Sequence, residues 1–137
     1  FFSQLGQLPS KQRRGLTTET LDQIYRERIL GPTCKPYFDY YRVRLKRYGT
    51  MEERAALAIL STVAEQERAS TSVLWEVYRK ARKKGGATEL GYCELMADLE
   101  CDWYLMLDPH TNEYFFMVSV MRDWWRRWFR APKTSRK

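Results

Sequence analysis

The order of secondary-structure signals between residues 51 and 130 is the feature that most constrains the fold of this chain. Three segments with helical periodicity are followed by two short apolar runs around a polar turn, and then by a fourth helical segment. The pattern predicts a mainly α domain that carries a small β-hairpin. It contains no nucleotide-binding loop, metal-ligand cluster or nucleophile with a base beside it.

Each predicted helix begins at a residue that can cap it. Thr50 precedes the first helix and Glu53 lies three residues later, as in a capping box. Ser70 or Ser72 can cap the second helix, and Thr88 can cap the third. These caps place the starts of three consecutive helices.

Apolar residues three and four positions apart give each helix one face that is expected to be buried. The hairpin is expected to pair Trp103–Leu107 with Tyr114–Val118 around the turn Asp108–Asn112. Three helices, a hairpin and a closing helix make up a winged helix-turn-helix, which is a binding module and not a catalytic scaffold. The expected buried sets are Ala56, Ile59, Leu60 and Val63, then Leu74, Val77, Tyr78 and Ala81, then Tyr92, Leu95, Met96 and Leu99, and finally Met121, Trp124, Trp125 and Trp128.

Two or three helices are predicted before this domain. After an opening helix tail at Phe1–Leu8, a helix is expected from Thr17 or Thr18 to about Leu30 and another from Pro36 to Tyr48. We therefore divide the chain into a helical segment 1–49, a winged-helix domain 50–131 and a basic tail 132–137. Because the chain begins at Phe1 without Met, we expect a fragment of a longer protein.

The charge balance points to an acidic partner. The 137 residues carry a formal charge of +7, and their basic residues are concentrated in segments 34–48, 76–84 and 122–137. Such patches attract phosphates without sequence preference, although lysines and arginines on amphipathic helices also serve only to solvate a surface. The candidate contacts to nucleic acid or to a protein partner are Arg79, Lys80, Arg82, Lys83, Lys84, His110, Arg126, Arg127 and Arg130.

The third predicted helix argues against ordinary DNA reading. Residues 88–102 hold five carboxylates and no basic residue, and the face opposite the apolar stripe is expected to present Gly91, Glu94 and Asp98. In a helix-turn-helix that reads DNA, this helix enters the major groove, where carboxylates are repelled by the phosphates. If DNA is bound, the hairpin and the basic helices are expected to bind it.

Signals for metal, cofactor or catalytic chemistry are weak. Cys34, Cys93 and Cys101 lack CxxC spacing and are expected to be reduced thiols without a zinc site. The apolar run before Asp108 imitates a magnesium-binding strand, but the chain has no GxxxxGK[ST] loop. His110 lies at a polar turn tip with no nucleophile near it in sequence. We expect no catalytic residue and no cofactor in this chain.

A membrane partner is also not expected. The longest apolar run, residues 114–121, is far shorter than the ~20 residues needed to span a bilayer. The Trp- and Arg-rich last helix could lie on a membrane surface, but its tryptophans serve more economically as core. With no signal peptide at the start, a cytoplasmic location is expected.

Several segments together resemble the end of AAA+/STAND-type P-loop ATPases. Phe1–Gln7 (FFSQLGQ) and Leu16–Leu21 (LTTETL) are similar to the last lid helices of those proteins. Tyr37–Leu45 and Ala55–Leu60 resemble their linker helix and first winged-helix helix, and Tyr114–Trp124 resembles their second wing strand and final helix. The similarity extends over essentially the whole chain, although each motif is mostly apolar patterning.

The resemblance implies a module C-terminal to an ATP- and magnesium-binding domain, which would be its main partner. In such families the winged helix either binds double-stranded DNA or packs on the nucleotide domain and relays its state. None of the family's catalytic motifs matches this chain, so no catalytic residue is carried over. The acidic third helix departs from the DNA-binding branch and favours a regulatory or interaction role.

Overall fold

The computed structural model describes residues 17–82 and 86–129. The chain divides into two compact units, Phe1–Arg42 and Val43–Lys137, so the division falls within a helix and earlier in the chain than our boundary at residue 49. Lys83, Lys84, Arg130, the expected helix tail at Phe1–Leu8 and the basic tail 132–137 lie outside the described residues.

The described part of the first unit is helical. Helix α3 (Thr18–Ile24) is capped by Thr17, whose Oγ1 accepts a hydrogen bond of 3.1 Å from the Thr20 amide, and it continues as the π-helical turn η1 (Tyr25–Ile29). The helix ends before Gly31 as expected, and this position needs glycine because a Cβ there would lie 2.0 Å from the Glu27 carbonyl oxygen. Helix α4 (Lys35–Arg44) follows.

The second unit begins with a sharp turn between two helices. The 3₁₀ turn η2 (Leu45–Tyr48) ends at Gly49, whose φ of 92° is open to glycine at little cost. Helix α5 (Thr50–Gln66) then starts at once. The predicted capping box at Thr50 is wrong: Glu53 donates its amide to the Gly49 carbonyl over 2.7 Å, so Gly49 is the N-cap and Thr50 already lies inside the first turn.

The next two helices begin at the predicted caps. Ser70 Oγ accepts from the Val73 amide (3.3 Å) at the start of α6 (Thr71–Ala81), and Thr88 Oγ1 accepts from the Gly91 amide (3.0 Å) at the start of α7 (Glu89–Cys101). Both serine and threonine thereby satisfy an amide that has no partner within its helix.

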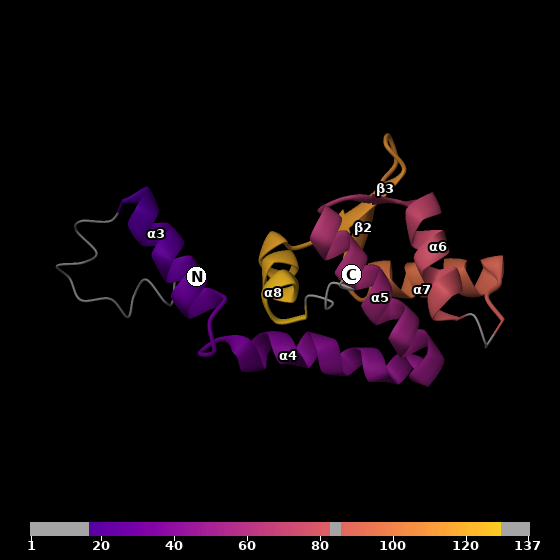
Figure 1. Ribbon diagram of the computed structural model, residues 1–137, viewed down its shortest axis with the longest axis horizontal. Helices are drawn as coiled ribbons and strands as arrows, with labels where there is room; N and C mark the ends of the chain where they lie inside the picture. The colour runs from indigo at the N-terminus through magenta and orange to yellow at the C-terminus, as the bar shows by residue number, and fades with distance from the viewer. Residues whose placement is uncertain (1–16, 83–85, 130–137) are drawn as a thin grey trace, which may run out of the picture. The chain divides into compact units, whose positions relative to one another are not determined.

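The hairpin is confirmed, with shorter strands than expected. Strand β2 (Leu105–Asp108) pairs antiparallel with β3 (Glu113–Phe116), and their turn projects away from the helices of this unit (Figure 1). A strand that we did not predict, β1 (Ala69–Ser70), pairs with β3 and makes the sheet order β1-β3-β2. Two residues are too few to show a period of two in sequence.

Helix α8 (Ser119–Phe129) closes the unit and supplies its largest core side chains. Trp124 and Trp125 are completely buried, as are Ile59, Leu60 and Val63 of α5. The described chain is thus mainly helical with a small antiparallel sheet, as predicted. Within the described residues, no helix is both long and apolar enough to cross a bilayer.

Candidate partner-binding surface

Helix α7 is buried along one face and open along the other. Its predicted inner residues, Tyr92, Leu95, Met96 and Leu99, are all buried. Glu94 and Asp98 are exposed as expected, but Gly91 is half-buried, because it packs against the Tyr78 hydroxyl. The outer face also exposes four side chains that we did not assign to it from the sequence, namely Leu90, Cys93, Ala97 and Cys101.

The outer face of α7 has an apolar centre and acidic borders. At about 100° per residue, Leu90, Ala97 and Cys101 fall within about 40° of one another, and we call these three residues the α7 ridge. Leu90 is 69% exposed. Glu94 and Asp98 follow one border of the ridge, and Glu89 and Glu100 follow the other.

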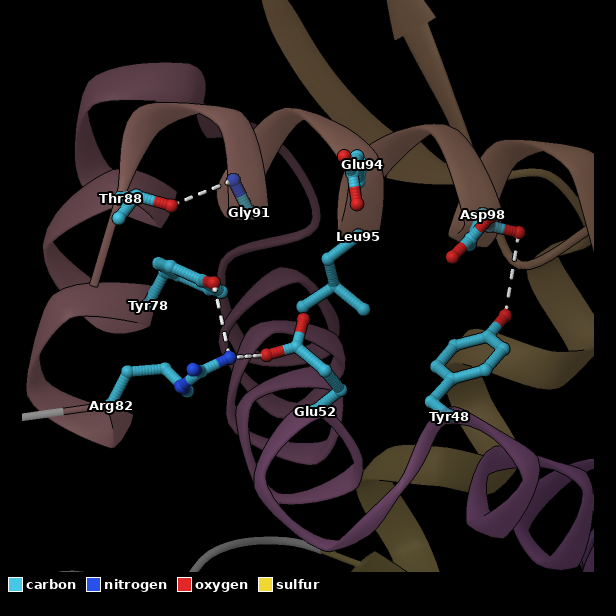
Figure 2. Close-up of a pocket in the computed structure, with 9 residues that line it drawn as sticks. All are labelled: Tyr48, Glu52, Tyr78, Arg82, Thr88, Gly91, Glu94, Leu95 and Asp98. Carbon is cyan, nitrogen blue, oxygen red and sulfur yellow. Dashed lines mark hydrogen bonds and ion pairs between the residues drawn. The ribbon is translucent and has the colours of Figure 1, made fainter. Parts of the chain in front are cut away.

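A polar pocket of about 310 Å³ opens beside Glu94 and Asp98. Its walls come from four elements (Figure 2), and Arg82 at the end of α6 forms an ion pair with Glu52 of α5 across it. The Arg82 guanidinium also donates to the Tyr78 hydroxyl over 3.4 Å. The lining residues are Tyr48, Glu52, Tyr78, Arg82, Thr88, Gly91, Glu94, Leu95 and Asp98.

The two tyrosine hydroxyls of the pocket are held neutral. Tyr48 donates to the Asp102 carboxylate, and it lies 3.3 Å from the Asp98 carbonyl oxygen. Burial and the Asp102 carboxylate raise the pKa of Tyr48 far above its ordinary value. Burial and the nearby charge of Glu94 likewise raise the pKa of Tyr78. Glu52 pairs with Arg82, whereas Glu94 and Asp98 form no ion pair with a described residue.

Trp103 adds an unusual feature at the C-terminal end of α7. The Tyr104 amide donates to the Leu99 carbonyl (2.9 Å) and the Trp103 amide to the Glu100 carbonyl (3.2 Å), which is the Schellman pattern of helix termination. Trp103 occupies the position where glycine is preferred, with a φ of 72°, and its side chain is 66% exposed. We had placed it at the start of a strand. That assignment is wrong, because the helix terminates through Trp103 and β2 begins at Leu105.

Two of the predicted basic contacts, Arg82 and Arg126, bind groups on other elements of the chain. Arg82 pairs with Glu52 inside the pocket. Arg126 donates from Nε to the Ala64 carbonyl (2.5 Å) and lies 3.6 Å from a Glu67 carboxylate oxygen, so it closes the C-terminal end of α5. The sequence alone did not show that these two arginines have partners within the chain whereas neighbouring basic residues are solvated.

The other described basic candidates lie on the surface. Arg79 is paired with Glu76 of the same helix at 2.8 Å. Lys80 and Arg127 are exposed and form no ion pair with any described residue, and the Arg127 guanidinium lies over the Trp128 ring. His110 is exposed at the tip of the β2–β3 turn. The structure therefore spreads these residues over several elements.

The turn that carries His110 is organised by Asp108. Its carboxylate accepts from the His110 amide over 2.9 Å and forms an ion pair with Arg68. The pKa of Asp108 is lowered below its usual 3.8, mainly by the hydrogen bond from the His110 amide and also by the Thr111 amide and Arg68. Asp108 thus has a structural role that accounts for its place after an apolar strand.

A comparison of the chain with protein-family models, with curated proteins and with solved structures finds no match.

Proposed function

We propose that residues 50–131 are a winged-helix module that acts by contacting protein, and that it regulates a P-loop ATPase of which it is a part. The element order α5–β1–α6–α7–β2–β3–α8 supports this reading. In it, α6 and α7 are the helix-turn-helix, and the β2–β3 hairpin, with β1 beside β3, is the wing.

The outer face of α7 is the observation that carries the proposal. In a helix-turn-helix that reads DNA, the second helix places polar and basic side chains against base edges. Here the corresponding face offers an apolar ridge bordered by Glu94 and Asp98. Carboxylates repel phosphates, whereas an exposed apolar ridge gains by burial against another protein surface. This face of α7 is therefore better suited to contact with a protein than to contact with DNA.

The ATPase assignment rests on the sequence resemblance. In this proposal, the nucleotide domain lies upstream in a longer cytoplasmic protein, it alone binds ATP and magnesium, and this module is not an enzyme. The module contributes a docking surface whose engagement alters nucleotide turnover. An ATPase domain encoded directly upstream of Phe1 would support the assignment, and an unrelated upstream sequence would count against it.

A DNA-binding winged helix is the second candidate. The exposed Lys80 and Arg127, which pair with no described carboxylate, and the formal charge of +7 favour it. Such binding would use the wing and the basic helices, because α7 would be repelled from the groove.

Fluorescence anisotropy with a labelled mixed-sequence DNA duplex separates the two candidates. If the module contacts protein, we expect only non-specific binding, with a Kd no tighter than about 1 μM at physiological salt. Glu94→Lys/Asp98→Lys is a sensitive control, since reversing charge on α7 should strengthen binding only where α7 faces the duplex. Nanomolar binding that Lys80→Glu/Arg127→Glu weakens would instead establish the DNA-binding candidate.

ATP turnover of the longer protein tests the regulatory role directly. Glu94→Lys/Asp98→Lys changes two exposed side chains and should leave the module folded, yet it should change the turnover rate. Arg127→Glu is a matched surface substitution away from α7. Turnover that is unchanged by the α7 variant, with folding verified by circular dichroism, would refute regulation through this face.

A further inference from the structure

We propose that the α7 ridge, together with Trp103, is the docking site for a cationic amphipathic helix of a partner protein, and that the adjacent pocket receives one of its basic side chains. The inference rests on the proposed function in one respect, which is that the module contacts protein through α7. It adds the chemistry of the partner.

The conformation of Trp103 is the first observation. An L-residue with a Cβ is disfavoured in the left-handed region, and a bulky residue there is a true outlier. Glycine would close α7 with the same two hydrogen bonds at no such cost. The indole of Trp103 is nevertheless two-thirds exposed, so burial within the fold does not compensate for the strain. An exposed, rigid aromatic held in a strained backbone is suited to anchor an interface.

The charge of α7 is the second observation. The chain has 24 basic residues and a net charge of +7, yet α7 holds four carboxylates and no basic residue. An apolar ridge with acidic borders is complementary to a helix whose apolar stripe has basic borders. The same charge disfavours nucleic acids and anionic membranes, because the carboxylates of α7 would repel their phosphates.

The pocket is the third observation. Glu94 and Asp98 border both the α7 ridge and the pocket, and neither forms an ion pair with a described residue. Arg82 does not neutralise them, because it is engaged by Glu52. An ammonium or guanidinium group entering from a helix that lies on the ridge would meet the carboxylates of Glu94 and Asp98. The Tyr78 hydroxyl lines the same pocket, next to Gly91.

Selection from a random library of displayed 18-residue helical peptides on the whole chain tests the proposal. We expect enriched peptides with apolar residues three and four positions apart and a net charge of at least about +3. Trp103→Gly should weaken binding of the synthesised peptides at least tenfold without lowering the melting temperature, because glycine suits the turn. Glu94→Gln/Asp98→Gln should weaken binding and flatten its salt dependence.

Two control variants distinguish specific docking from non-specific binding of peptides. Trp103→Ala removes the indole but keeps the strained Cβ, so it should lose binding without the thermal benefit of glycine. Tyr37→Ala removes another highly exposed aromatic, in the other unit, and should leave binding unchanged. Failure to enrich any peptide, enrichment of neutral or acidic peptides, or binding independent of Trp103 would each overturn the proposal. Tight DNA binding in the anisotropy experiment would instead overturn the proposed function beneath it.

Discussion

Close contact between Gly91 and Tyr78 shows how a single residue shapes the candidate site. A Cβ at Gly91 would lie 2.6 Å from the Tyr78 hydroxyl oxygen and 3.0 Å from Thr88 Oγ1. The Tyr78 ring cannot easily retreat, because it is 99% buried and packs against Trp75 and Tyr92. Glycine is otherwise a poor helix former, so its use in α7 is explained by this approach.

Gly91→Ala should therefore lower the free energy of unfolding by about 1–3 kcal/mol, as overpacking does, although alanine is the better helix former. Urea denaturation followed by circular dichroism measures the change. In a Tyr78→Phe background the hydroxyl is gone, and the cost of the same substitution should fall below about 1 kcal/mol. An equal cost in both backgrounds would show that the Tyr78 hydroxyl is not the constraint.

Asp108 gives a pH dependence whose sign follows from its surroundings. The turn amides and Arg68 stabilise the carboxylate, so its pKa in the folded protein lies below the ordinary value of 3.8. A depressed folded pKa contributes stability that is complete above the unfolded pKa and is lost as the pH falls through the folded pKa. The melting temperature of Asp108→Ala should thus lie below that of the wild type at pH 7. This difference should shrink as the pH falls from about 4 to about 2. A difference that stays constant over this range would contradict the assignment.

At the scale of elements, arginines of α8 bind groups at the C-terminal end of α5. Arg126 donates to the Ala64 carbonyl, which lies in the last turn of α5 and has no amide partner farther along that helix. Glu67, in the left-handed region with a φ of 67°, receives both Arg122 and Arg126 at 3.6 Å. The adjacent Arg127 takes no part in this closure.

Arg126→Met retains the aliphatic stem but removes the donor and the charge. We expect it to lower the free energy of unfolding by about 1 kcal/mol, which is below the usual range for charged hydrogen bonds because the side chain is partly solvated. Arg127→Met should change stability by less than about 0.5 kcal/mol, as is usual for an exposed residue. Guanidinium titration of both variants measures the difference, and equal effects would mean that the Ala64 contact is not stabilising.

The same pair of arginines shows what the sequence could and could not predict. Helical periodicity identified the buried faces of α5 and α7 and the caps Ser70 and Thr88, because both signals are local. It could not tell Arg126 from Arg127, because the partner of Arg126 is 62 positions away in sequence and only the tertiary fold brings it near. Strand β1 was missed because two residues show no period in sequence, and the exposure of Trp103 was missed because a bulky residue is not expected in the left-handed turn that ends a helix.

At the scale of the whole molecule, the division into two units falls after Arg42, inside α4. Leu45 is completely buried in the second unit, and Tyr48 is hydrogen-bonded to Asp98 of α7 and to Asp102, which caps the end of that helix. The turn η2 therefore belongs physically to the second unit. From the sequence we placed the boundary after this turn, at Gly49. A glycine marks the end of a helix, but it does not mark the limit of a hydrophobic core.

Two fragments decide which boundary defines the folding unit. A fragment of residues 43–137 should unfold cooperatively near the melting temperature of the full chain, because its buried core is self-contained. A fragment of residues 50–137 exposes the surface that Leu45 covers and frees the Asp102 carboxylate from Tyr48. Losing a buried leucine alone costs about 2–5 kcal/mol, and for a domain of this size that corresponds to a fall of about 10 °C or more in melting temperature. Calorimetry of both fragments measures this. Equal melting temperatures would place the boundary at Gly49 after all, and a 43–137 fragment that fails to fold would show that the second unit depends on α3 and the start of α4.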